Sequence, residues 1–514
     1  MLRAGAVAPA LELLKRVEHI HPQSPDVMRM LGVAHLQAGR PDVAEPFFRA
    51  VLLAKQDSAM AASDLAHVLM ALDRAEEALD TLLPQVPLMR ETKAGPDAAT
   101  FHFNLGRAFK MLGRSSEAAQ PLRQTLAFQP GHYAALVMLG DVEKALGKNE
   151  TAAEYYRKAM QMRPNDGAAW WALSNLKTSD FTDTEFAELQ KLAATVEGGE
   201  QKVFFDFALA RGFEQRKDRD RAFACYRSGN LEKRRLEPWD RTGFSRWMAS
   251  LRDSMGKMEL PPRRQTLERP RPVFLVSLPR SGSTLTEQVL AAHSQVTAAG
   301  ELPWIPKIMA EESDSRRQKG QAAGLTHWAT VLNEQEWREL GNRYLQHCRN
   351  WHQDTRVFTD KLPGNIPYVG VILAMLPDAL IVNIRRDAMD VCWSCYRQLF
   401  ISGAGFAYDL DDLAAYWKEH EQHMAFWREK APDRILNLDY EALVQKPEEQ
   451  IRRLLAFLEL PFEPACLKSH ETERAVNTPS AAQVREAINT RGIGHWRKYE
   501  GHLDGLMRAI KQDH

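Results

Sequence analysis

The sequence has few cysteines, no excess charge of either sign and no long apolar run. Five cysteines in 514 residues are too few and too scattered for a disulfide framework. Lys plus Arg and Asp plus Glu number 67 each, which excludes the overall basic excess of a nucleic-acid-binding protein. No window approaches the ~18 apolar residues of a membrane span. We therefore expect a cytoplasmic protein with no membrane span, no nucleic-acid partner and only local basic sites.

Length and composition are those of an ordinary folded protein with more than one domain. Hydrophobic residues make up 44% and charged residues 26% of the chain, as in soluble globular proteins. A chain of 514 residues is long enough for two to four domains. The apolar run near the N-terminus returns to charge at once, which predicts an amphipathic helix and not a signal peptide.

The first half of the chain repeats with a period of 34 residues. Leu105-Gly106, Ala118 and Pro130 recur as Leu139-Gly140, Ala152 and Pro164. Further copies of the same pattern are Leu31-Gly32, Ala44 and Phe48; Leu65-Ala66, Ala78 and Leu82; and Leu209-Ala210, Phe213, Ala222 and Tyr226. The pattern is typical of tetratricopeptide repeats, so we expect an α-solenoid over residues 1–250. Its concave face would bind a protein or peptide partner, or the array would stiffen an assembly.

The second half alternates short β-rich runs with helical stretches. Residues 251–271, which include ELPPRRQTLERPR, predict a linker. The expected strands are 273–277, 356–360, 379–384 and 434–440, and the expected helices are 285–293, 366–376, 388–400, 411–430 and 447–458. This alternation predicts an α/β domain over residues 272–514, with a parallel sheet and helices on both faces.

The stretch LVSLPRSGST joins the first of these strands to a helix, as in a phosphate-binding loop. It fits G-x-x-x-x-G-K-[ST] from Ser277 to Thr284, except that Ser277 replaces the first Gly and Ser283 the Lys. Backbone N–H groups of Arg280, Ser281, Gly282, Ser283 and Thr284 could hold one phosphate at the helix N-terminus. Without the Lys, the loop favours a single 5′-phosphate and no metal. The alternative is a turn that binds nothing.

Several ordered motifs then resemble one family. They are PRSGSTL, AAHSQVTAAGE, TDKLPGN, NIRRDAMDVCWSCYRQLF, LDYEAL and TPSAAQVREAINTRGIGHW. The stretch from about 270 to 500 resembles the sulfotransferases that use 3′-phosphoadenosine-5′-phosphosulfate (PAPS). It is most similar to tyrosylprotein sulfotransferases and bacterial tetratricopeptide-repeat sulfotransferases. The resemblance implies a P-loop-like fold whose loop holds the 5′-phosphosulfate.

The resemblance also assigns the other nucleotide contacts. Arg386, at a strand end, and Ser394, two helical turns later, would bind the 3′-phosphate. Arg491 resembles a late basic-glycine motif that is shortened here, and Tyr440 and Ser480 match nucleotide contacts of the tyrosylprotein branch. The alternatives are a surface Arg386 paired with a neighbouring Asp and a buried, purely structural Tyr440.

Two residues are expected to carry out the chemistry. Lys361, just past a strand, resembles the family lysine near the scissile bridge and would stabilise charge on the leaving oxygen. Glu301 is the expected general base, although the tyrosylprotein enzymes have two adjacent Glu residues where this chain has Glu301-Leu302. His327 and Asp360 are the next candidates for the base.

The leading hypothesis is therefore a PAPS-dependent sulfotransferase with no metal. The acceptor could be a protein, a peptide, a carbohydrate or a small molecule, and a protein or peptide tyrosine suits the repeat array. Two alternatives remain. One is a non-catalytic repeat scaffold with a degenerate nucleotide-binding domain, and the other is a P-loop kinase, which the missing loop Lys disfavours.

Overall fold

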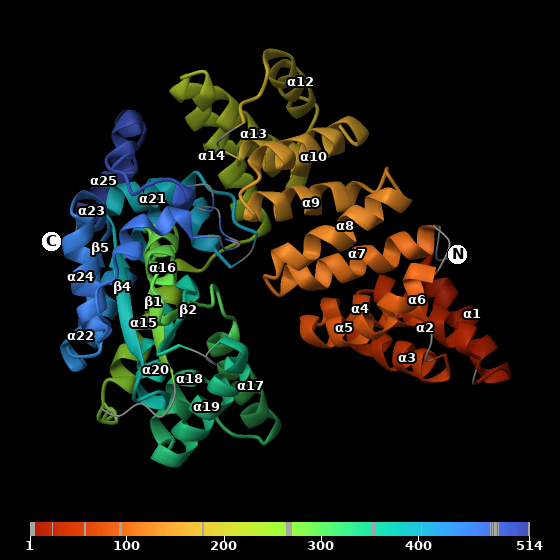
Figure 1. Cartoon of the computed structure of the whole chain (residues 1–514), viewed down its shortest axis with the longest axis horizontal. Coiled ribbons are helices and arrows are strands. Elements are labelled where there is room, and N and C mark those ends of the chain that lie inside the picture. Colours follow the sequence, from red (N-terminus) through yellow and green to blue (C-terminus); the bar gives the residue numbers. More distant parts are fainter. Residues whose placement is uncertain are drawn as a thin grey trace. The chain divides into compact units, whose positions relative to one another are not determined.

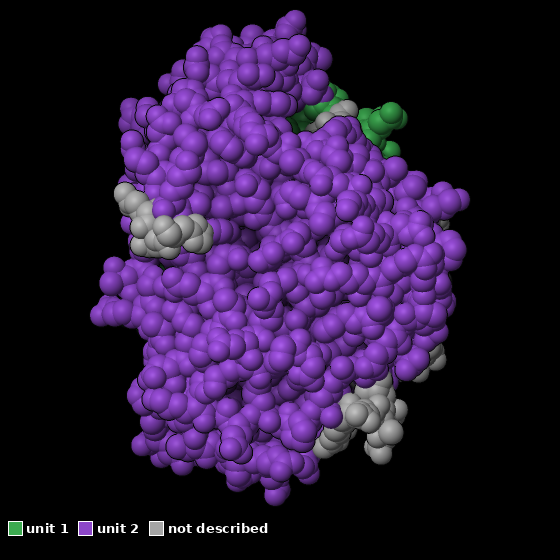
Figure 2. Space-filling model, turned by 90° about the vertical axis from the view of Figure 1, so that its left-hand side faces the viewer, with its two compact units in different colours: residues 1–179, 474–477 green, residues 180–473, 478–514 purple. Residues whose placement is uncertain are grey.

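Two compact units make up the chain. The computed structural model describes residues 6–22, 24–55, 58–91, 95–176, 179–263, 270–351, 355–401, 403–472, 474, 476, 478, 481 and 483–511. Unit 1 comprises residues 1–179 with 474–477, and unit 2 comprises residues 180–473 with 478–514 (Figure 2). Across the described ranges, none of the helices has both the length and the apolar character of a bilayer-spanning segment.

Unit 1 is a stack of helices (Figure 1). Its helices are α1 (Val7–Ile20), α2 (Pro25–Gln37), α3 (Pro41–Ala54), α4 (Ala59–Ala71), α5 (Ala75–Leu82), α6 (Val86–Glu91), α7 (Pro96–Met111), α8 (Ser115–Phe128), α9 (Tyr133–Ala145), α10 (Asn149–Met162) and α11 (Gly167–Ser174). Helices α2 and α3, α4 and α5, α7 and α8, and α9 and α10 pack as successive pairs. The predicted solenoid of helix pairs is confirmed.

The repeat pattern follows from close packing inside each helix pair. A Cβ atom added to Gly140 would lie 2.4 Å from the ring of Tyr156, and one added to Gly106 would lie 2.7 Å from Leu122. The ring of Phe48 fills the space beside Gly32 in the same way. In all three pairs the large residue follows the Gly by 16 positions. The small residue on the first helix therefore makes room for the large residue on the second.

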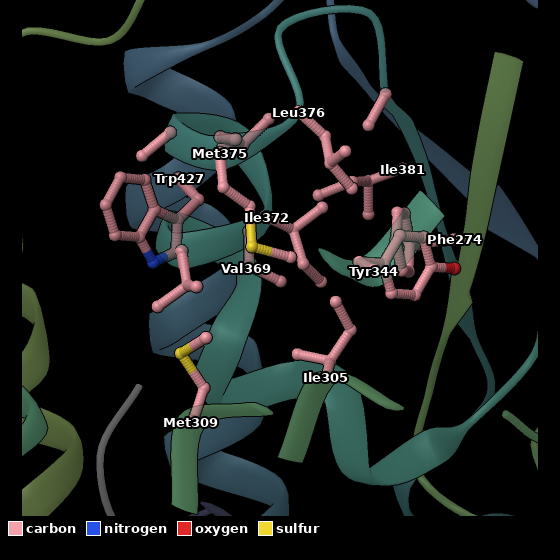
Figure 3. Close-up of a cluster of buried hydrophobic side chains, with 14 of the residues drawn as sticks. Phe274, Ile305, Met309, Tyr344, Val369, Ile372, Met375, Leu376, Ile381 and Trp427 are labelled. Carbon is pink, nitrogen blue, oxygen red and sulfur yellow. The ribbon is translucent and has the colours of Figure 1, made fainter. Parts of the chain in front are cut away.

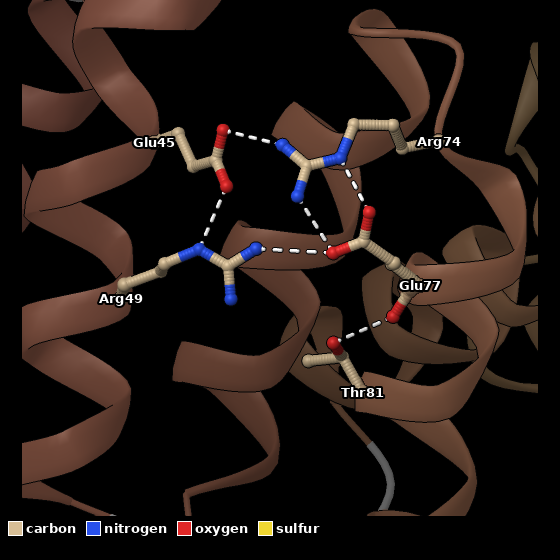
Figure 4. Close-up of polar contacts among 5 residues, drawn as sticks. All are labelled: Glu45, Arg49, Arg74, Glu77 and Thr81. Atoms are coloured by element: carbon tan, nitrogen blue, oxygen red, sulfur yellow. Dashed lines mark hydrogen bonds and ion pairs between the residues drawn. The ribbon is translucent and has the colours of Figure 1, made fainter.

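A surface network joins α3 of one pair to α5 of the next (Figure 4). Glu45 accepts from Arg49 and Arg74, each at 2.7 Å, and Arg74 also reaches Glu77 at 2.6 Å. Arg49 completes the network with a 3.2 Å bond to Glu77. Because these side chains are partly exposed, each ion pair taken singly contributes little to stability.

Unit 2 is built on a five-stranded parallel sheet, with strands β1 (Arg271–Val276), β2 (Val296–Ala298), β3 (Val357–Asp360), β4 (Leu380–Arg385) and β5 (Ile435–Asp439). The strand order is β2-β3-β1-β4-β5. Phe274 pairs with Asp360 across β1 and β3, and Arg385 pairs with Asp439 across β4 and β5. Four of these strands match the sequence prediction, and β2 is an addition to it.

Helices and 3₁₀ segments surround the sheet. Before it come α12 (Asp183–Ala193), α13 (Gly199–Gln215), α14 (Arg219–Leu236) and α15 (Arg241–Met255). The others are α16 (Ser283–Ala291), α17 (Trp304–Gln318), α18 (Leu325–Trp328), α19 (Glu334–His347), η5 (Pro363–Tyr368), α20 (Val369–Met375), α21 (Ala388–Tyr396), η6 (Gly405–Tyr408), α22 (Leu410–Lys430), α23 (Tyr440–Gln445), α24 (Pro447–Phe457), η7 (Pro464–Glu471), η9 (His495–His502) and α25 (Asp504–Lys511).

Alternate residues of the strands enter two separate cores, one on each face of the sheet. Phe274 and Val276 face a core formed with α15, α17, α19, α20 and α22, where Trp427 is fully buried and Phe274 lies beside Tyr344 (Figure 3). Val273 and Leu275 face a second core formed with α16, α23 and α24. Helices therefore cover both faces, as predicted, and the central strand β1 is buried over its whole length.

The boundary between the units lies well before the end of the expected repeat array. Residues 180–473 and 478–514 belong to the sheet unit, and α15 continues to Met255 inside the expected linker. Met248, Leu251 and Met255 are buried in the core on one face of the sheet. The repeat pattern hid this boundary because Ala210 and Tyr226, on α13 and α14, keep the 16-residue spacing of the array.

A truncation series tests this division. A fragment of residues 180–514 should unfold cooperatively, whereas residues 251–514 should aggregate, because loss of α13, α14 and most of α15 exposes apolar core. Circular dichroism during urea titration would distinguish the two fragments. A cooperative transition of the 251–514 fragment, as stable as the longer one, would contradict the assignment of α13–α15 to the sheet unit.

Candidate active site

Each of the five strands is followed by a candidate residue. The phosphate loop follows β1, Glu301 follows β2, Lys361 follows β3, Arg386 follows β4 and Tyr440 follows β5. Because the strands are parallel, their carboxyl ends meet at one edge of the sheet. Ligands of open α/β sheets bind at this edge. Pairing of the strands therefore gathers residues that are up to 160 positions apart.

The phosphate loop turns sharply into α16. Arg280 and Gly282 have left-handed φ angles of 69° and 100°, and α16 begins at Ser283. Gly282 is the N-cap and offers no capping side chain, so the first N–H groups of α16 remain available for an anion. A Cβ at Gly282 would lie 2.5 Å from the ring of Tyr440, so only Gly fits both the φ angle and the space.

Hydroxyl groups line the loop. Ser281, Ser283 and Thr284 are buried, and the Thr284 Oγ1 lies 3.2 Å from the Oγ1 of Thr478. The Oγ of Ser277 is fully buried and has no hydrogen-bond partner among the described residues. A buried polar atom normally has a partner. The orphaned hydroxyl, like the uncapped helix, fits a site for a phosphate group.

Arg386 is the centre of a second group of donors. Its Nη1 donates to the carbonyl of Arg280 at 2.6 Å, and its Nη2 donates to the carbonyl of Gly492 at 2.5 Å. Its Nε is buried without an acceptor among the described residues, and its guanidinium lies 4.7 Å from the ring centroid of Tyr440. The Nε of Arg280 donates to the Oγ of Ser394 at 3.3 Å. The structure thus places the expected 3′-phosphate residues around the phosphate loop.

Positive charge is concentrated here. Burial first, and then the nearby charge of Arg386, lower the pKa of Arg280 to about 10. Arg386 is directed at carbonyl groups, while the expected alternative partners are used elsewhere: Asp387 caps α21, and Asp390 accepts from the N–H of Gly494 at 2.6 Å. A bound anion would relieve the repulsion between the two guanidinium groups.

Glu301 and Lys361 form an ion pair. The Lys361 side chain is 2% exposed and that of Glu301 is 44% exposed, so the ammonium is fixed inside while the carboxylate faces outward. The N–H of Lys361 also donates to the carbonyl of Gly300 at 2.8 Å. Both expected catalytic side chains therefore lie together, with only the carboxylate open to an incoming molecule.

Glu287 is a buried residue that holds the loop of Glu301 in place, and the sequence analysis did not predict it. It is fully buried on α16 and accepts from the N–H of Gly300 at 2.9 Å and from the Oγ1 of Thr359 at 3.0 Å. It therefore ties the phosphate-loop helix to the loop that carries Glu301. The available signal was a carboxylate in LTEQVL, inside a helix whose neighbours predict burial.

The two other candidates for the base are placed unfavourably. Asp360 is fully buried and accepts from Tyr344 at 3.0 Å and from Asn365 at 3.2 Å. Burial raises its pKa to about 8, so the carboxyl group is protonated at neutral pH. His327 is exposed on α18. Glu301 remains the accessible carboxylate next to Lys361.

The Arg491 side chain, an expected nucleotide contact, does not join the site. The Arg491 side chain is 72% exposed and pairs with Glu486, while its Nε reaches Asn489 at 3.2 Å. The backbone carbonyl of Gly492, not the Arg491 side chain, contacts Arg386. Ser480 lies outside the described residues. In the parts of the chain that the structure describes, no group of three or more His, Cys, Asp or Glu side chains is arranged for a metal ion.

Comparisons with known proteins find similarities to two kinds of protein, in different parts of the chain. Residues 272–464 match the model of the sulfotransferase family, and residues 1–63, 57–131 and 133–166 match models of the tetratricopeptide repeat.

Several relatives match part of the chain. An uncharacterized protein of Aquifex aeolicus is 34% identical over 316 residues, which cover 60% of this chain and 41% of that protein. The protein-tyrosine sulfotransferase of Drosophila melanogaster is 26% identical, over 44% of this chain and 46% of its own length. Protein-tyrosine sulfotransferase 1 of Danio rerio is 27% identical, over 44% and 65% respectively. The chain thus spans less than half the length of the Aquifex and Drosophila relatives.

Solved structures of both kinds are similar to parts of the chain. The sulfotransferase domain of a Synechococcus olefin synthase aligns with a TM-score of 0.34 and 22% identity, over 46% of this chain and 91% of that domain. The MamA protein aligns with a TM-score of 0.27 and 21% identity, over 32% of this chain and 86% of that protein. The chain thus has segments that match the tetratricopeptide repeat in its first half and a segment, residues 272–464, that matches the sulfotransferase family.

Proposed function

We propose that this protein transfers a sulfuryl group from PAPS to an acceptor hydroxyl. The observation that supports this most strongly is the joint position of three groups at one edge of the sheet. These are the uncapped phosphate loop, Arg386 with an Nε that has no acceptor among the described residues, and the ion pair of Glu301 and Lys361. An anion site beside an accessible carboxylate suits group transfer better than simple nucleotide storage.

The nucleotide would bind with its two phosphate ends on different strands. The N–H groups at the start of α16 and the hydroxyls of Ser277 and Thr284 would hold the 5′-phosphosulfate. Arg386, Arg280 and Ser394 would hold the 3′-phosphate. The Arg386 Nε has no acceptor in the described part of the chain, and the two neighbouring guanidinium groups favour a dianion there.

Transfer then needs a base and a stabilised leaving group. Glu301 would take the proton of the acceptor hydroxyl as that oxygen forms a bond to sulfur. The bond from sulfur to the 5′-phosphate oxygen breaks, and its electron pair stays on the phosphate. Lys361, which pairs with Glu301 before reaction, would stabilise the negative charge that builds on that oxygen. One ammonium thus serves the carboxylate first and the leaving group afterwards.

For the acceptor, we propose a tyrosine of a protein or peptide. Two relatives with 26–27% identity are named protein-tyrosine sulfotransferases, and the repeat array supplies a surface of the kind that binds peptides. A carbohydrate or a small-molecule hydroxyl is the alternative, and assays with all three classes would distinguish them.

Arg386→Ala should weaken binding of 3′,5′-adenosine bisphosphate by ~10- to 100-fold, since hydrogen bonds to charged groups contribute ~1.5–3 kcal/mol each. AMP, which lacks the 3′-phosphate, should bind this variant nearly as it binds the wild type. Arg385→Ala is the matched control, because Arg385 is the adjacent residue and pairs with Asp439 at 2.8 Å. Calorimetric titration measures all these affinities. Equal effects of the two substitutions would refute the assignment of Arg386.

Glu301→Gln should lower sulfuryl transfer from labelled PAPS by the ~10²- to 10⁴-fold typical of a general base. Its affinity for the bisphosphate should not change. Glu311→Gln is the control, since Glu311 is 46% exposed, close to the 44% of Glu301, and also pairs with a cation, Arg343. Transfer to a panel of peptide, carbohydrate and phenol acceptors gives the rates. Full activity of Glu301→Gln on every acceptor used by the wild type would remove Glu301 as the base.

The raised pKa of Asp360 predicts that the stability of the protein depends on pH. Its folded pKa of about 8 lies above the value of ~3.9 expected for an unfolded chain, so the folded state binds the extra proton between these values. Stability contributed by that proton is complete below pH ~4 and is lost as the pH rises toward 8. Asp360→Asn removes this dependence. The free energy of unfolding of the variant, relative to wild type, should rise from pH 5 to pH 8 in urea titrations, and a constant difference would contradict a raised pKa.

A further inference from the structure

A buried carboxylate outside the sulfotransferase match joins the helix pair α13 and α14 to the site. Glu214, in the last turn of α13, accepts from Arg211 at 2.9 Å, Arg397 at 2.9 Å, the hydroxyl of Tyr226 at 3.1 Å and the hydroxyl of Tyr499 at 2.8 Å. Burial alone would raise the pKa of Glu214, but Arg397 and then Arg211 outweigh it and hold the pKa at about 2. One carboxylate therefore connects four segments of unit 2.

Two of these segments carry parts of the nucleotide site. Arg397 ends α21, three residues after Ser394, and its Nη1 also lies 2.9 Å from the Nδ1 of His495. Tyr499 and His495 belong to η9, which follows the turn that presents the carbonyl of Gly492 to Arg386. Glu214 thus holds both the helix of Ser394 and the segment after Gly492.

Aromatic side chains also connect α21 to α14 and η9. Trp393, the residue before Ser394, is almost fully buried, and its ring centroid lies 4.5 Å from Tyr499, 5.9 Å from Phe223 and 6.1 Å from Tyr226. The side chains around Trp393 therefore come from α14 and η9 as well as from α21. This packing leaves the end of α21 little freedom to move independently of α14 and η9.

We propose that Glu214 is a positioning residue for the 3′-phosphate end of the nucleotide. It acts through Arg397 on Ser394 and through Tyr499 on the turn at Gly492. The proposal rests on the proposed function, since it assigns a support to that same site. It gives the α13 and α14 pair, which resembles a repeat, a role in nucleotide selectivity in addition to packing.

Loss of the Glu214 carboxylate should disturb the residues that would contact the 3′-phosphate. Arg397 and Arg211 would then be left close together without their shared anion, in a region that already holds Arg280 and Arg386. Repulsion and the missing bond to Tyr499 would let α21 and η9 shift. The effect should fall on the 3′-phosphate contacts, because the phosphate loop and α16 have no bond to Glu214.

The test is Glu214→Gln in the full-length chain, with affinities for 3′,5′-adenosine bisphosphate and AMP measured by calorimetry. The dissociation constant of AMP divided by that of the bisphosphate reports the contribution of the 3′-phosphate to binding. This ratio should fall by ~10-fold, the low end of the ~10- to 100-fold losses known for groups that orient the ligands of a metal, which we take as the scale for a group that orients phosphate contacts. AMP affinity should stay within about twofold, because AMP makes no 3′-phosphate contact.

Glu419→Gln is the matched control. Glu419 is 13% exposed, against 14% for Glu214, and pairs at 2.9 Å with Arg252 between α15 and α22. It should reduce thermal stability while leaving the ratio unchanged. Tyr499→Phe, which removes one donor to Glu214 and preserves packing, should lower the ratio in the same direction and keeps the test available if Glu214→Gln does not fold.

Failure of the positioning role and failure of the proposed function give different results. An unchanged ratio in Glu214→Gln, or in Tyr499→Phe if only that variant folds, overturns the positioning role while the proposed function stands. A ratio lowered equally by Glu419→Gln also overturns it, because the effect would then be general destabilisation. A wild-type chain that does not prefer the bisphosphate overturns the proposed function, and this inference falls with it.

Discussion

Parallel pairing of five strands is the constraint on which the candidate site depends. Parallel strands point their carboxyl ends the same way, so the order β2-β3-β1-β4-β5 brings five separate loops to one edge. Each loop contributes one element: the phosphate loop, Glu301, Lys361, Arg386 or Tyr440. The two apolar cores, one on each face, hold that edge rigid. The candidate residues are thus far apart in the sequence, and the sheet brings them together at one edge.

Buried carboxylates then connect these loops to their surroundings. Glu287 ties the phosphate-loop helix to the loop of Glu301, and Glu214 ties α13 and α14 to α21 and η9. Each accepts several donors, which compensates the cost of burying its charge or its polar atoms. A repeat-like helix pair is thus part of the sheet unit and contacts the segments that carry Ser394 and Gly492.

The sequence alone predicted most of the architecture and most of the side chains that the structure brings together at the candidate site. The period of 34 residues identified the solenoid, and apolar runs located four strands, because both signals are local. The three residues of β2 were too short to stand out, and the unit boundary at 179/180 was hidden by a helix pair that keeps the repeat spacing. Glu287 and Glu214 were missed because their roles arise from partners distant in sequence. Arg491 was misplaced because its motif is carried here by the backbone of Gly492.

The most direct test of the account is calorimetric titration of the full-length protein with three nucleotides: 3′,5′-adenosine bisphosphate, AMP, and ATP with Mg²⁺. If Arg386, Arg280 and Ser394 form a 3′-phosphate site, the bisphosphate should bind at least ~10-fold more tightly than AMP. ATP with Mg²⁺ should bind weakly, because the loop has no Lys for its outer phosphates. Equal affinity for the bisphosphate and AMP, or a preference for ATP with Mg²⁺, would contradict a PAPS site at this edge of the sheet.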